Sequence, residues 1–134
     1  MLVIFAPKFP KRYRRRVARL LRKYADVYNL QNGWECTVTT EVASEHTASI
    51  NCVVQSHLVQ LDLLPERLSD LRLLETDIAH ELWHVLYWRT ASAIQHLPKK
   101  LSAPLMEAFE EDHDTASRVW LRHLFAKRDQ GPEG

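Results

Sequence analysis

The sequence lacks a long hydrophobic run and has few cysteines, and these absences exclude whole classes of protein. Its longest apolar run is the six residues Met1–Ala6, whereas a membrane-spanning helix needs about 20. The positive charges follow this run, and Pro7 and Pro10 interrupt the sequence after it, which is unlike a secretory signal. Two cysteines, Cys36 and Cys52, are too few for a disulfide scaffold. We therefore expect a cytoplasmic protein with no membrane span.

Negative charge is absent from the first 25 residues, although the net charge of the whole chain is only +1. This segment carries nine basic side chains, which are Lys8, Lys11, Arg12, Arg14, Arg15, Arg16, Arg19, Arg22 and Lys23. The rest of the chain carries nine basic and 17 acidic side chains, a net charge of −8. A segment this basic suits an acidic partner or a nucleic-acid backbone. The alternative is that it forms only the solvated face of an amphipathic helix.

The hydrophobic pattern predicts an α+β protein with a single domain over residues 1–128 and a frayed tail over 129–134. Apolar residues spaced by three and four positions predict an N-terminal helix from Pro10 to Tyr28. Two further helices are predicted over residues 64–92 and 103–125, each with a proline near its start.

Between the first two predicted helices the sequence reads as strands. Apolar and polar residues alternate over 34–39 and 48–55, and a shorter run follows at 57–63. We expect these three strands to form a small antiparallel sheet, while Met1–Ala6 suits either a strand or an extended arm. Cys36 and Cys52 fall on the apolar phases of their strands. Buried reduced thiols are the simpler interpretation, and a cross-strand disulfide or a metal role is the alternative.

The residues that indicate chemistry are His80-Glu81-x-x-His84 in the second predicted helix. Two histidines four residues apart on a helix share one face, where both imidazoles can bind one Zn²⁺. Glu81 lies beside them and is placed to take a proton from a water that the metal activates. The motif therefore predicts metal-assisted hydrolysis of a peptide bond. The alternative is a pair of structural histidines beside a solvated glutamate.

A catalytic zinc site of this kind needs a third protein ligand. Thr90 stands six residues beyond His84 and cannot bind zinc, so the metzincin pattern is absent. His96 follows soon after and is more simply a surface histidine. Four acidic or basic side chains of the last predicted helix remain as candidates, namely Glu107, Glu110, Glu111 and His113.

The sequence here resembles the gluzincin metallopeptidases, in which the third ligand is a glutamate on a later helix. The resemblance covers about residues 76–120. Glu110-x-x-x-Asp114 matches the gluzincin pattern of a ligand glutamate followed by a supporting carboxylate, and Glu110 lies 26 residues beyond His84. The resemblance implies that His80, His84 and Glu110 hold zinc and that Asp114 orients one of the histidines.

The short chain and its element order also resemble minimal, single-domain gluzincins and the compact peptidases of phage and mobile elements, including the regulator-cleaving ImmA/IrrE type. That group often has a small residue three positions beyond the ligand glutamate, where this chain has His113. Tyr87, His113 and His123 all remain candidates for stabilising the oxyanion.

The resulting hypothesis is a zinc-dependent endopeptidase that binds its protein or peptide substrate between the sheet and the HExxH helix. One alternative is a zinc-stabilised binding or regulatory module whose basic helix docks on an acidic partner or DNA. Another is a zinc hydrolase that acts on a non-peptide bond. The sequence predicts no particular oligomeric state.

Overall fold

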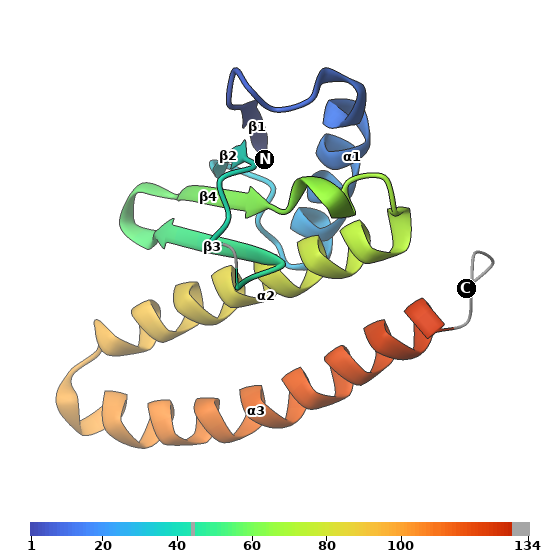
Figure 1. Ribbon diagram of the computed structural model, residues 1–134. Coiled ribbons are helices and arrows are strands. Elements are labelled where there is room, and N and C mark those ends of the chain that lie inside the picture. The colour runs from blue at the N-terminus through green and yellow to red at the C-terminus, as the bar shows by residue number, and fades with distance from the viewer. Residues whose placement is uncertain (44, 130–134) are drawn as a thin grey trace. The chain divides into compact units, whose positions relative to one another are not determined.

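The first half of the chain contains the strands and the first helix, and the second half is helical (Figure 1). The computed structural model describes residues 1–43 and 45–129. The elements are β1 (Leu2–Phe5), α1 (Lys11–Val27), β2 (Glu35–Thr39), β3 (Ala48–Val53), η1 (Val54–Ser56), β4 (Leu58–Leu63), η2 (Pro65–Arg67), α2 (Leu71–Gln95) and α3 (Lys99–Asp129), where η denotes a 3₁₀ turn. The chain divides into two compact units, Met1–Val85 and Leu86–Gly134, and α2 runs from the first into the second.

The four strands form one mixed sheet in the order β1-β2-β4-β3. The α+β class is therefore confirmed, but the predicted three-stranded antiparallel sheet is wrong. β1, β2 and β4 are parallel, and only β3 and β4 pair antiparallel. The extra strand is Leu2–Phe5, which α1 connects to β2 as a crossover between parallel strands. β4 lies between β2 and β3 because it is the more apolar strand of the β3–β4 hairpin and gains most from a central position.

The strand register aligns one apolar row across all four strands, which is buried at Val38 and Leu61 and partly exposed at both ends. Phe5 pairs with Val38, Val38 with Leu61, and Leu61 with Ile50. In the next row Cys36 and Cys52 each pair with Val59, so one strand separates the two thiols. Neighbouring strands lie about 4.8 Å apart, and two cysteines two strands apart exceed the roughly 7 Å limit for a disulfide. Both cysteines are free, as predicted, but only Cys36 is buried and Cys52 is partly exposed.

The first helix has the predicted apolar stripe. Its buried side chains are Val17, Leu20, Leu21, Tyr24 and Ala25. The helix ends with Asn29 in the left-handed region at φ 57°, where asparagine is tolerated better than most residues. The amide of Leu30 then donates to the carbonyl of Ala25 at 2.7 Å, which satisfies a terminal helix carbonyl. The predicted bounds, Pro10 to Tyr28, are correct to within one residue.

The later helices depart from their predicted bounds at both ends. Leu64 to Arg67 is not α-helical, because Pro65–Arg67 forms a 3₁₀ turn, and α2 begins only at Leu71. α3 begins at Lys99, before Pro104, since the Pro98 carbonyl already accepts the amides of Leu101 and Ser102 at 2.9 Å. α3 continues to Asp129, so this first residue of the predicted tail is helical, and residues 130–134 lie outside the described residues.

Candidate metal centre

The segment that carries the HExxH motif is anchored at its N-terminal end by two carboxylates. Asp70 caps α2, because its Oδ1 accepts the amides of Arg72 and Leu73, each at 3.1 Å. Seven residues later, Asp77 is 8% exposed and receives two hydrogen bonds from Arg67, at 2.6 Å from Nε and 2.9 Å from Nη2. A bidentate pair of this kind fixes orientation as well as position. The turn before α2 is thus tied to the helix three residues before His80.

A second anchor comes from α1. The Tyr28 hydroxyl donates to the carbonyl of Ala79 at 2.9 Å, and the Tyr28 and Trp83 rings meet edge-on with centroids 5.7 Å apart. Tyr24 and Lys23 both donate to Glu75 at 2.7 Å. The stretch of α2 that bears the motif is therefore held against α1 by polar and aromatic contacts.

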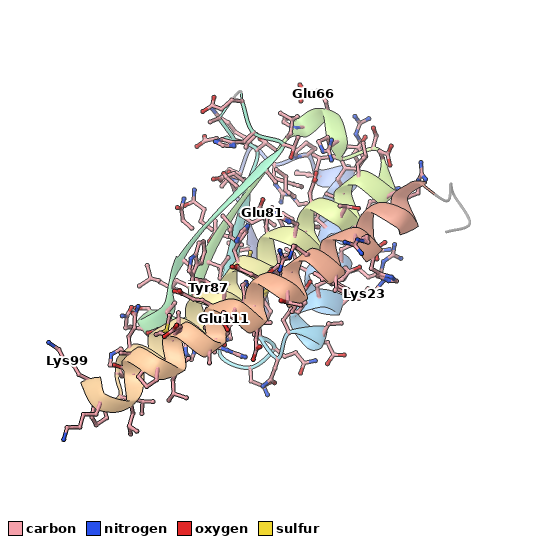
Figure 2. All side chains as sticks on the ribbon, turned by 90° about the horizontal axis from the view of Figure 1, so that it is seen from below. Lys23, Glu66, Glu81, Tyr87, Lys99 and Glu111 are labelled. Atoms are coloured by element: carbon pink, nitrogen blue, oxygen red, sulfur yellow. The ribbon has the colours of Figure 1, made fainter. Side chains whose placement is uncertain are left out.

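Packing also sets which way the motif faces. The fully buried side chains of this stretch are Leu74, Ile78, Ala79, Leu82 and Val85, which recur at the spacing of one helical face. His80, Glu81 and His84 lie beside this stripe and are only partly buried. Figure 2 shows Glu81 midway along α2. The three motif side chains are thus partly shielded by the fold and still reachable from solvent.

The side chains of the two motif histidines lie in contact with each other. Their Nε2 atoms are 3.2 Å apart, and their rings are nearly perpendicular, at 87°. Two nitrogens about 2.0–2.1 Å from one tetrahedral zinc lie roughly 3.3–3.4 Å from each other. This separation is close to that of two zinc ligands, and it also suits a direct hydrogen bond between the two rings. Burial lowers the pKa of His80, and burial together with His80 lowers the pKa of His84, which favours the neutral imidazole that binds metals.

The environment of Glu81 suits proton transfer. Burial, together with the nearby charge of Asp77, raises the pKa of Glu81 to about 7. A carboxylate with a pKa close to neutral pH can both accept and return a proton there. Asp77 thus has two effects, since its bond to Arg67 anchors the helix and its charge disfavours ionisation of Glu81.

This raised pKa predicts a pH-dependent stability of the metal-free protein. The unfolded chain ionises Glu81 near pH 4.5, whereas the folded protein keeps the proton up to about pH 7. The free energy of unfolding contributed by this group therefore falls as the pH rises through that window. Replacing Glu81 with Gln removes the contribution, so the Glu81→Gln variant should gain stability relative to wild type between these pH values.

Urea unfolding in the presence of a chelator, at a series of pH values, measures this difference. The matched control is Glu66→Gln, which changes an exposed carboxylate on the turn before α2. This control should keep the pH profile of the wild type. If the profiles of Glu81→Gln and wild type ran parallel across the whole range, burial of an ionisable Glu81 would be refuted.

The predicted third ligand and its neighbours lie in the second unit. Glu110 and Asp114 are exposed on α3. The Tyr87 hydroxyl, on the C-terminal part of α2, donates to Oε1 of Glu110 at 3.4 Å. Burial, then the charge and hydrogen bond of Glu110, and then the charge of Asp114 raise the pKa of Tyr87. Tyr87 therefore hydrogen-bonds to Glu110 and also lies close enough to Asp114 to be affected by its charge.

His113 has a different environment from the carboxylates around it. Its ring centroid lies 4.6 Å from that of Tyr87 and 5.6 Å from that of Phe109, and the rings of Tyr87 and Phe109 are stacked 5.4 Å apart. His113 is thus part of an aromatic cluster. Glu107 and Glu111 are exposed on α3, as Glu110 is.

The structure brings together part of the predicted site. His80, Glu81 and His84 lie together in the first unit, whereas Glu110 and Asp114 lie together in the second. Over residues 1–43 and 45–129, no group of three or more His, Cys, Asp or Glu side chains is arranged to hold a metal ion. Ligation by Glu110 and support by Asp114 therefore stay predictions.

Two other histidines that the sequence analysis considered, His96 and His123, contact residues outside the HExxH motif. Nδ1 of His96 lies 2.6 Å from the carbonyl of Ser92, and His123 stacks on Trp120 with centroids 5.7 Å apart.

The pairing of Arg67 with Asp77 was not predicted from the sequence, although Asp77 precedes His80 by only three residues. The one available signal was a charged residue at an inward-facing position of an apolar helix.

Comparison with known proteins gave no match to a family model, a curated protein or a solved structure. The candidate site is therefore argued from the geometry of its residues alone. None of the described helices combines the length and the apolar character needed to cross a membrane.

Proposed function

We propose that this protein is a zinc-dependent endopeptidase of the gluzincin type. The observation that carries the proposal is the 3.2 Å separation of the His80 and His84 Nε2 atoms, which fits two ligands of one tetrahedral zinc. In the proposal His80, His84 and Glu110 hold the metal, Glu81 transfers protons, and Asp114 orients a ligand.

The proposed chemistry divides between metal and protein. Zinc, when bound, supplies a Lewis acid that polarises the scissile carbonyl and lowers the pKa of a water. Glu81 removes a proton from the attacking water and later delivers it to the departing amine nitrogen, so the carboxylate is regenerated in each cycle. Its pKa of about 7 in the metal-free site supports both transfers at neutral pH.

The substrate would be an extended peptide that pairs with β3. This strand lies at an edge of the sheet and, within the described residues, pairs only with β4, so its other side offers backbone groups to a peptide. Side-chain recognition on this strand is supported by Asn51 and Val53, which are exposed.

The first test is metal content. We expect the purified protein to bind about one zinc ion per chain, and His80→Ala and His84→Ala to lose it because each removes one of the paired nitrogens. His96→Ala is the matched control, since it removes an exposed histidine just beyond the end of α2. Elemental analysis after dialysis measures the content. A wild-type chain that stays metal-free in added zinc would overturn the proposal.

A further inference from the structure

The outward face of α1 carries positive charge that the fold does not neutralise. Three of the nine cations in residues 1–25 have structural roles. Lys23 forms an ion pair with Glu75. Arg14 donates hydrogen bonds to the carbonyls of Ala6, Pro7 and Phe9, and Arg16 donates to those of Leu68 and Ser69. The other six are exposed, namely Lys8, Lys11, Arg12, Arg15, Arg19 and Arg22. None of these six forms an ion pair with another residue of the described chain.

This arrangement works against the stability of the helix. Arg15 and Arg19 are four residues apart and Arg19 and Arg22 three apart, so their charges repel along one face. The first turn of α1 contains no acidic residue, and Lys11 and Arg12 there oppose the helix dipole. A merely solvated face would gain from interspersed acidic residues, which this face does not have. The unpaired charge therefore indicates an anionic partner outside the chain.

Three of these six side chains, Arg15, Arg19 and Arg22, help to line a shallow, open hollow in the surface. It has a volume of about 510 Å³ and is formed by Phe5, Arg14, Arg15, Ala18, Arg19 and Arg22, which we call the basic groove. Ala18 is the short side chain among the four arginines. Phe5 comes from β1 and is partly exposed. The groove thus combines guanidinium groups with one apolar ring.

We propose that the basic groove binds the sugar–phosphate backbone of a nucleic acid. Arg15, Arg19 and Arg22 advance about 6 and 4.5 Å along the helix axis, which gives a regular row of forked donors for successive phosphates. The Phe5 ring favours a nucleic acid over an acidic peptide, because sugars and bases present apolar surface beside the charge. Binding through the backbone is independent of sequence and weakens steeply with salt.

The test compares two triple variants of the full chain that lose the same charge. Arg15→Gln/Arg19→Gln/Arg22→Gln removes three side chains of the groove, and Lys99→Gln/Lys100→Gln/Arg118→Gln removes three exposed cations of α3. Fluorescence anisotropy would measure binding of a labelled single-stranded DNA, the corresponding duplex and the corresponding RNA between roughly 50 and 200 mM salt. A poly-glutamate peptide serves as the competing polyanion.

We expect the groove variant to bind at least ~10-fold more weakly than wild type at low salt. Its salt slope should be smaller by roughly 2–3, because each lost phosphate contact removes about 0.7–0.9. The α3 variant should stay close to wild type, and circular dichroism should show both variants folded. The preferred oligonucleotide then identifies the form of nucleic acid.

Three results would overturn the proposal. One is the absence of binding to any of the oligonucleotides at low salt. The second is equal weakening in the two variants, which would assign the effect to net charge alone. The third is binding of poly-glutamate as tight as that of the oligonucleotides, which would favour an acidic protein partner. The proposal does not depend on zinc or on Glu81, so these assays are separate from those of the peptidase.

Discussion

Replacing Glu81 with Gln should remove peptide hydrolysis while leaving zinc content and fold intact. Glutamine has nearly the same shape as glutamate but cannot take a proton from the attacking water. A positioned general base contributes typically 10²–10⁴-fold to the rate, so we expect a loss of at least about that size. Two measurements are needed on the same preparation, namely cleavage of an unstructured protein substrate and zinc per chain.

Glu66→Gln is the matched control because it makes the same chemical change at an exposed position in the same unit. Its activity should equal that of wild type. If Glu81→Gln cleaved as fast as wild type, Glu81 would have no part in the mechanism. If zinc bound normally but neither protein cleaved any peptide, the zinc-stabilised binding module would be the better hypothesis.

The second large effect concerns the third ligand. Glu110→Ala should lower zinc affinity more than Glu107→Ala or Glu111→Ala, because it removes one of three ligands rather than an exposed charge. The hydrogen bond from Tyr87 to Oε1 of Glu110 adds to the sequence argument, since it can hold that carboxylate in one orientation. Asp114→Ala should fall between, at about 10–100-fold weaker affinity, as expected for a residue that orients a ligand.

Competition with a chelator would rank the zinc affinities of these variants and of His113→Ala. His113 is the most informative comparison because it packs on Tyr87 and Phe109, so its loss disturbs the same cluster without removing a carboxylate. If His113→Ala or Glu111→Ala released zinc while Glu110→Ala retained it, the assigned third ligand would be wrong. A site with three histidines would also no longer be of the gluzincin type.

The periodicity of apolar residues was sufficient to predict those features that depend only on residues close together in the sequence. The apolar stripe of α1, the existence of strands within 34–39, 48–55 and 57–63, and a helix carrying the HExxH motif were all predicted. The pairing of His80 with His84 follows from a spacing of one helical turn. These features need only the geometry of a single element.

Contacts between distant segments were decided by the tertiary structure. Leu2–Phe5 was ambiguous because four apolar residues suit an arm as well as a strand, and only the crossover through α1 makes it a parallel partner of β2. Strand order depends on which strand gains most from a central position, which the alternation within each strand does not reveal. The bounds of α2 and α3 depended on caps and turns that prolines alone do not specify.

The sequence by itself determined which side chains carry the candidate chemistry, because one helical turn fixes the spacing of His80, Glu81 and His84. Only the tertiary structure decided their properties. Burial lowers the pKa of both histidines and, together with the charge of Asp77, raises the pKa of Glu81 to about 7. Desolvation depends on the atoms that surround a group, and those atoms come from segments far away in the sequence.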